Sequence, residues 1–124
     1  MPLAATAAFL LAAAVACGAF GAHALKTHLD AYLMGVWEKA VFYHFVHGLA
    51  ILAVALCARA GLLTPVNATR IGLLFLVGIA LFSGSLYALA LTRVATLGAV
   101  TPLGGLSFIA AWLWLGVALL RAPR

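Results

Sequence analysis

Charged residues are scarce in this chain of 124 residues. Only 7% of them are charged, whereas 68% are hydrophobic; an ordinary soluble domain has roughly 25% charged residues. A soluble domain could not cover so large an apolar share with polar surface. The shortage of charge therefore excludes a soluble fold and predicts one domain, residues 1–124, embedded in a membrane.

Acidic residues and cysteines are rarer still. The chain holds two acidic residues, Asp30 and Glu38, and two cysteines, Cys17 and Cys57. Because no predicted span contains a carboxylate that could orient a histidine as a base, we expect no enzymatic activity. The cysteines have neither the spacing of a disulfide framework nor that of a zinc site. We therefore predict no metal and no cofactor.

What the sequence does contain is long uncharged runs. They cover residues 1–25, 40–58, 71–92 and 94–120. Each run reaches or exceeds the roughly 18 residues that indicate a spanning helix, which rises 1.5 Å per residue through a hydrocarbon core of about 30 Å. The sequence predicts an all-α integral membrane protein, a bundle of four transmembrane helices. The predicted helices cover about 3–25, 39–58, 70–91 and 101–120.

The segment at about 27–38, between the first two spans, mixes charged residues with apolar residues at helical spacing. This pattern predicts a short amphipathic helix that lies at the membrane interface. The alternative is that Asp30 caps one long helix, which begins at about residue 31 and continues into the second span.

Basic residues exceed acidic ones, which gives a formal net charge of +5. They stand singly at the ends of the predicted helices, as headgroup anchors do, and this pattern favours a lipid bilayer rather than nucleic acid as the partner. One membrane side collects Arg59, Arg70, Arg121 and Arg124, and the other collects Lys26, Lys39 and Arg93. The positive-inside rule then places both termini and the 59–70 loop on the cytoplasmic side of the membrane.

Several polar side chains fall inside the predicted spans, where lipid offers no hydrogen-bonding partner. We predict that they form one polar cluster and a candidate ligand site. Its members are His23, Tyr43, His47, Ser83, Ser85, Tyr87 and Thr101. His47 lies about three turns into the second span, where an ionisable residue is a functional candidate. The alternative is a neutral His47 that bonds to Ser83, Ser85 or Tyr87 and ties two helices together.

Small residues and a proline are predicted to let the helices approach closely. They are Gly18, Gly21, Ala80, Gly84, Pro102, Gly104 and Gly105. We expect Thr101 to cap the fourth helix with Pro102 in its first turn. The alternative is a longer helix with a kink at Pro102.

Four motifs together resemble one known family. They are GAFGAHALK at 18–26, the pair Tyr43 and His47, LFSGSLY at 81–87 and TPLGG at 101–105. In this order they resemble the YgdD-like family of small bacterial inner-membrane proteins, a domain of unknown function (number 423). The resemblance implies a four-helix membrane protein and a set of signature positions, but no reaction. His44 lies outside that signature.

The functional expectation is a non-catalytic scaffold associated with lipid, with a homo-oligomer or with a larger membrane complex. One alternative is conduction of protons or of a small polar solute along the His, Tyr and Ser side chains. A lesser alternative is a metal or haem site, for which His44 and His47 lie three residues apart on one helix.

Overall fold

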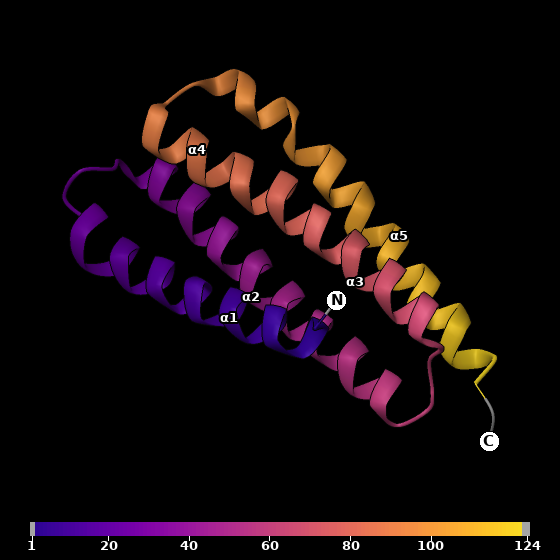
Figure 1. The fold of residues 1–124 in the computed structure, drawn as a ribbon. Coiled ribbons are helices and arrows are strands. Elements are labelled where there is room, and N and C mark those ends of the chain that lie inside the picture. The colour runs from indigo at the N-terminus through magenta and orange to yellow at the C-terminus, as the bar shows by residue number, and fades with distance from the viewer. Residues whose placement is uncertain (1, 123–124) are drawn as a thin grey trace.

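Four long apolar helices form most of residues 2–122, the part of the chain that the computed structural model describes (Figure 1). They cover Leu3–Leu25, Ala31–Arg59, Pro65–Thr92 and Ala95–Leu120. Each is long and apolar enough to cross a membrane.

The four spans are built from eight helical elements. The first span consists of α1 (Leu3–Phe20) and a π-helical turn, η1 (Gly21–Leu25), and the second is α2 (Ala31–Arg59) alone. The third combines α3 (Pro65–Gly78), a second π-helical turn, η2 (Ile79–Ser83), and α4 (Gly84–Thr92). The fourth consists of a 3-10 helix, η3 (Ala95–Ala99), and α5 (Thr101–Leu120).

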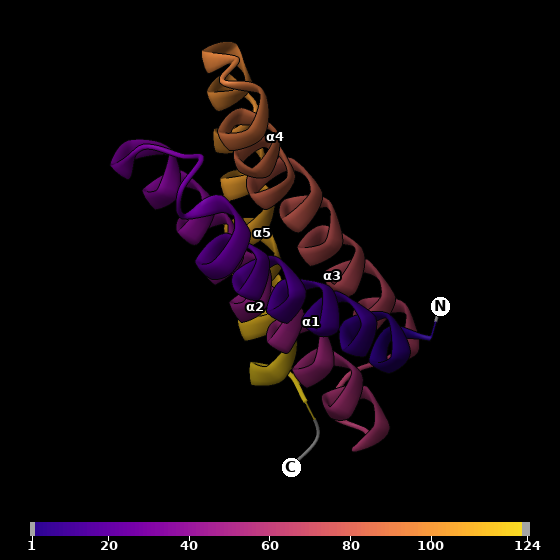
Figure 2. The ribbon, with the colours of Figure 1, turned by 90° about the vertical axis from the view of Figure 1, so that its left-hand side faces the viewer.

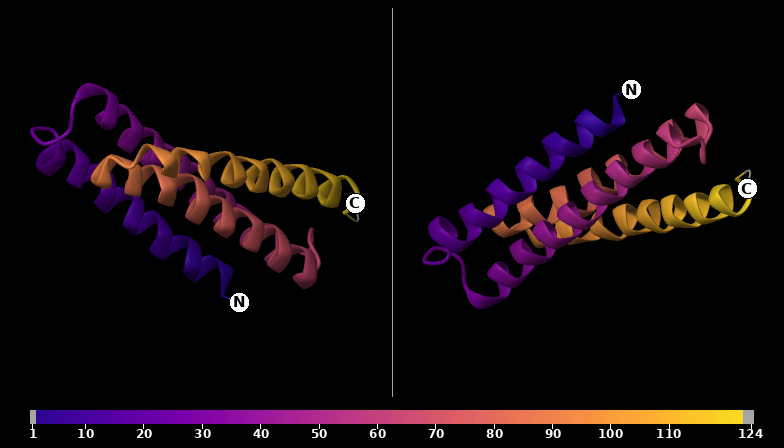
Figure 3. Two further views of the ribbon diagram at one scale, coloured as in Figure 1. Left: turned by 90° about the horizontal axis from the view of Figure 1, so that it is seen from above. Right: turned by 90° about the horizontal axis from the view of Figure 1, so that it is seen from below.

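The second and third spans form the centre of the bundle. α1 packs mainly on α2, and α5 packs mainly on α3 and η2, so that α1 and α5 flank the central pair (Figures 1 and 2). The largest fully buried side chains, Phe75, Ile51 and Ile71, lie in this centre. The start of α1, the end of α5 and the turn between α2 and α3 lie at one end of the bundle, opposite the connection between the first two spans (Figure 3).

The predicted interfacial helix at 27–38 is not a separate element. α2 begins at Ala31 and continues without interruption to Arg59. The Asp30 carboxylate caps it by accepting a hydrogen bond of 2.8 Å from the Leu33 amide, which satisfies one of the free amides of the first turn. The alternative, one long capped helix, is therefore the one that forms.

The turn between α2 and α3 is closed by backbone hydrogen bonds and a side-chain cap. Gly61 has a φ of +76°, and the amide of Leu62 donates to the carbonyl of Cys57 at 2.9 Å, as in a glycine-terminated helix end. The Thr64 hydroxyl then accepts from the Asn67 amide at 3.2 Å. Because Thr64 caps the helix and Pro65 occupies its first turn, α3 starts five residues before the predicted boundary at 70.

Thr101 does not cap the fourth helix. The N-cap of α5 is Val100, no side chain caps this helix, and Pro102 lies within its first turn. The Thr101 hydroxyl lies 2.7 Å from the hydroxyl of Ser85 on α4 instead. Because lipid offers no hydrogen-bonding partner, the Thr101 hydroxyl bonds to the buried Ser85 of the neighbouring helix instead of capping its own helix.

Two of the predicted packing residues make very close contacts. A Cβ atom on Gly104 would lie within 3.0 Å of three atoms of Phe82, two of which belong to the backbone. A Cβ atom on Gly21 would come within 2.6 Å of the Trp37 indole. These glycines let α5 approach η2, and let the first span approach α2, at distances that a larger residue would prevent.

The other predicted packing positions are looser. Gly18 and Gly105 leave ordinary van der Waals room for a Cβ atom, and the nearest atom to one on Gly84 lies at 3.9 Å. Ala80 and Pro102 are exposed, so the prediction that these two residues let neighbouring helices of the chain approach closely is wrong. Gly78 takes over this role, since a Cβ atom there would overlap the Phe108 ring.

Candidate functional site

His47 lies inside a stack of aromatic rings. Its imidazole is parallel to the Phe108 ring, with centroids 3.5 Å apart and planes within 7°, and Tyr43 lies on the same face of α2 at 5.7 Å. His47 Nδ1 donates to the carbonyl of Tyr43, one helical turn back, at 2.7 Å. Nδ1 of His47 is therefore satisfied within its own helix rather than by the serines of the third span, and the ring packs against aromatic side chains.

The two serines of the third span bond to different helices. The fully buried Ser83 hydroxyl donates to the Ala40 carbonyl of α2 at 2.7 Å, and Ser85 pairs with Thr101 of α5. Residues two apart on a helix point about 200° apart, so Ser83 and Ser85 face opposite neighbours. Each bond joins a pair of helices and is worth about 0.5–1 kcal/mol within a membrane.

Tyr87 bonds to the histidine outside the family signature. His44 Nδ1 lies 3.0 Å from the Tyr87 hydroxyl, while the Tyr87 ring packs against Trp37 with centroids 4.6 Å apart. The Trp37 indole nitrogen donates to the Cys17 carbonyl on α1 at 2.9 Å. These contacts form a second centre, made of Trp37, His44 and Tyr87, which joins α1, α2 and α4.

The predicted single cluster is therefore divided into separate sets. His47 and Tyr43 belong to the aromatic stack, and His23 is exposed at the end of the first span, apart from the others. The second centre was missed by the sequence reasoning, although Trp37 and His44 are seven residues apart and so share one face of α2. Ser107 was also missed; its hydroxyl donates to the Leu74 carbonyl at 2.7 Å and joins α5 to α3.

His44 also carries an unsatisfied atom. Its Nε2 is buried and has no hydrogen-bonding partner among residues 2–122, although the backbone of Leu10 on α1 lies nearby. Within residues 2–122, no group of three or more His, Cys, Asp or Glu side chains is placed to hold a metal ion. The polar side chains of this region form hydrogen bonds that join pairs of helices.

One family matches most of the chain, including all four motifs. The family described as "Protein of unknown function (DUF423)" matches residues 17–105. The chain belongs to this family. Among its relatives, the UPF0382 membrane protein SSP2132 of Staphylococcus saprophyticus is 48% identical over 102 residues, which is 82% of each chain.

Two other DUF423 relatives are similarly close. A UPF0382 membrane protein of Staphylococcus epidermidis is 48% identical over 108 residues, covering 87% of this chain and 86% of its own. The UPF0382 membrane protein YwdK of Bacillus subtilis is 44% identical over 109 residues, 87% of each chain. No solved structure matches the chain. The relatives and the four apolar helices confirm the predicted family, the all-α membrane fold and the description as a membrane protein of unknown function.

Proposed function

We propose that this DUF423 protein is a non-catalytic scaffold that binds phospholipids of the bacterial inner membrane along its outer faces. The observation that carries the proposal is a set of four surface grooves with one basic side chain each. The grooves have volumes of about 510, 260, 360 and 380 Å³ and contain, in this order, Arg59, Arg70, Arg121 and Lys39. Their remaining walls are mainly apolar, as acyl chains require.

The basic side chains lie at the depth of phospholipid phosphates. Lys39 and Arg59 are twenty residues apart on α2, which corresponds to about 30 Å and equals the thickness of the hydrocarbon core. They therefore stand at its two boundaries, where an ammonium or guanidinium group meets phosphate oxygens. Trp114, which lines the grooves of both Arg70 and Arg121, belongs to the aromatic residues that favour this level.

The interior supports a scaffold rather than a proton or solute pathway. The hydroxyls of Ser83, Ser85 and Ser107 each bond to a neighbouring helix or to their own. The rings of His47 and Phe108 fill the space between α2 and α5. Polar groups used in this way fix the rotation of each helix and need no transported species.

The test of this proposal counts phospholipid molecules retained per protein after purification in mild detergent. A quadruple variant with Arg59, Arg70, Arg121 and Lys39 changed to Gln is expected to retain less than half the lipid phosphorus of the native protein. Arg93→Gln is the matched control, because Arg93 donates to the His28 carbonyl at 3.1 Å and lines none of these grooves. Equal lipid retention in the quadruple variant would contradict the proposal.

Reconstituted vesicles distinguish the scaffold from the conducting alternative. A pH-sensitive dye inside the vesicles is expected to report the same proton leak with and without the protein. A leak that the protein induces and that His47→Gln abolishes would instead establish the conducting function.

We also propose that both termini and the turn between α2 and α3 face the cytoplasm, because Arg59, Arg70 and Arg121 gather at that end. In a background without Cys17 and Cys57, a cysteine at the exposed Thr27 is expected to react with an impermeant maleimide in intact cells. A cysteine at the exposed Ala60 is expected to react only after permeabilisation. The reverse labelling would invert the topology.

The exposed sides of α1 and α5 are the surfaces through which a homo-oligomer or a larger membrane complex would form. Phe9 of α1 is 78% exposed and Leu113 of α5 is 68% exposed, and no other helix within residues 2–122 covers either side chain. A measurement of the mass of the protein in nanodiscs shows how many copies associate.

A further inference from the structure

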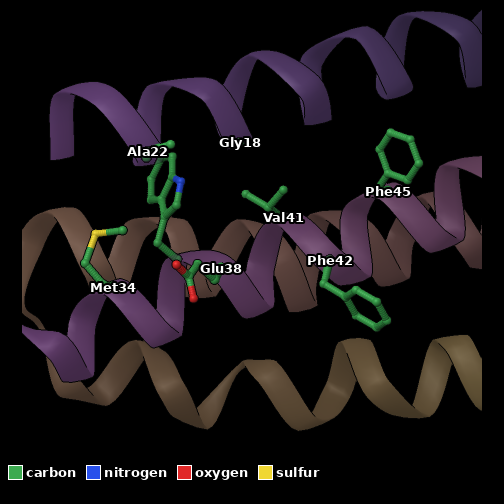
Figure 4. Close-up of a pocket in the computed structure, with 9 residues that line it drawn as sticks. Gly18, Ala22, Met34, Glu38, Val41, Phe42 and Phe45 are labelled. Carbon is green, nitrogen blue, oxygen red and sulfur yellow. The ribbon is translucent and has the colours of Figure 1, made fainter. Parts of the chain in front are cut away.

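A fifth groove differs from the four basic ones. It lies between the first span and α2, with a volume of about 350 Å³. Gly18 and Ala22 lie on the side of the first span, and Val41 and Phe42 lie on the side of α2 (Figure 4). Its lining contains the Glu38 carboxylate and no basic side chain. The charge of this groove is therefore opposite to that of the others.

Glu38 has no cationic partner within its own helix. The residues three and four positions away are Met34, Gly35, Val41 and Phe42, and these are the neighbours with which a helical side chain forms ion pairs. Lys39, the next residue, lines a different groove, which α2 shares with α4 and α5. Across residues 2–122, no Lys, Arg or His nitrogen lies within the 4.0 Å of an ion pair with this carboxylate.

The position of Glu38 makes a lipid headgroup the available partner. Glu38 is exposed and directly precedes Lys39, which the proposed function places at the hydrocarbon boundary, so Glu38 lies at the level of the headgroups. Phe45 lies seven residues further along α2 and also lines the groove. The groove therefore extends about 10 Å from the boundary into the hydrocarbon layer, where it is accessible to an acyl chain.

We infer that this groove selects a phospholipid with a primary ammonium headgroup, such as phosphatidylethanolamine. This inference rests on the proposed phospholipid-binding function and adds the identity of one bound lipid. A primary ammonium donates charge-assisted hydrogen bonds to the Glu38 carboxylate. The trimethylammonium of phosphatidylcholine has no N–H donor, and the net negative charge of phosphatidylglycerol is repelled. One acyl chain lies along Gly18, Val41 and Phe42.

Native mass spectrometry of the full chain with phosphatidylethanolamine or phosphatidylcholine of identical acyl chains tests the inference. The native protein is expected to bind one ethanolamine lipid about tenfold more tightly than the choline lipid, which is the lower end of the effect of one added hydrogen bond to a charged group. Glu38→Gln is expected to reduce this ratio to about one. Arg93→Gln is the control, because Arg93 lines neither this groove nor the four basic ones, and it is expected to keep the native ratio.

A second variant separates the groove from the headgroup. Ala22 is exposed and lines the groove, so Ala22→Phe fills the acyl-chain site without entering the packed core. It is expected to remove the selectively bound ethanolamine lipid while the protein stays folded and monodisperse.

The outcomes distinguish the inference from the function on which it rests. A native ratio near one, or a ratio unchanged by Glu38→Gln, overturns the inference while lipid binding itself persists. A second protein copy in the groove, seen as a dimer that Ala22→Phe dissociates, also overturns it. Failure of the native protein to retain any phospholipid overturns the proposed function instead.

Discussion

Replacement of Gly104 by leucine is expected to lower the thermal unfolding temperature in detergent by about 10 °C or more, which corresponds to about 3 kcal/mol. A side chain at this position would meet the Phe82 backbone, which a rotamer change cannot move. Even Gly104→Ala is expected to lower the stability, since a Cβ atom alone already overlaps those atoms. The loss of the intrinsic fluorescence signal on heating measures the effect.

Gly116→Ala is the matched control for this prediction. Gly116 lies on the same helix, and nothing lies within 4 Å of a Cβ atom added there. Because alanine also favours a helix over glycine by roughly 1 kcal/mol, the control is expected to equal or exceed the native stability. Equal stability of Gly104→Leu and Gly116→Ala would show that the approach of α5 to η2 is not close.

His47→Ala is expected to destabilise the bundle by about 3 kcal/mol, because it leaves a cavity against Phe108 in a core that cannot collapse freely. The His47 side chain is 6% exposed. His47→Phe keeps an aromatic ring in the stack and gives up only the bond to the Tyr43 carbonyl. It is therefore expected to stay within about 1 kcal/mol of the native protein. Unfolding in increasing denaturant measures both differences.

The comparison of the two His47 variants decides between packing and ligand binding. If His47 binds a ligand, His47→Phe loses that ligand. If His47 serves only in packing, His47→Phe keeps the properties of the native protein. Phe9→Ala serves as a control for aromatic truncation in general, because Phe9 is 78% exposed and its loss is expected to change the stability by less than about 0.5 kcal/mol. Native stability in His47→Ala would contradict the packing role.

The two histidines of α2 show why the polar partners could not be predicted along with the fold. His44 and His47 are three residues apart, so their side chains point only about 60° apart around the helix. A rotation of α2 by that amount would exchange their neighbours. In a span that is apolar on all sides, hydropathy does not determine this rotation. The expected bond between His47 and the third span therefore occurs at His44 instead.

The glycines likewise separate what the sequence predicts from what only the tertiary structure determines. A glycine in a span indicates that some helix comes near, and the motif residues Gly21 and Gly104 do lie at such contacts. The sequence does not say which glycine faces a neighbour and which faces lipid, because both environments are apolar. Ala80 and Gly84 have the spacing of a packing pair but Ala80 is exposed, whereas Gly78 faces Phe108.

Local and compositional signals were enough to predict the four spans, the membrane environment, the family and the alternative of a long helix capped by Asp30. The spans and the membrane environment follow from the hydrophobicity of contiguous runs, the cap follows from a bond between residues close in the chain, and the family follows from the four motifs. The division of the polar residues into an aromatic stack, interhelical serine bonds and the Trp37, His44 and Tyr87 centre depends on the rotation and depth of each helix relative to the others. Contacts between distant segments set those quantities, and Glu38 became notable only once the grooves on either side of α2 were known.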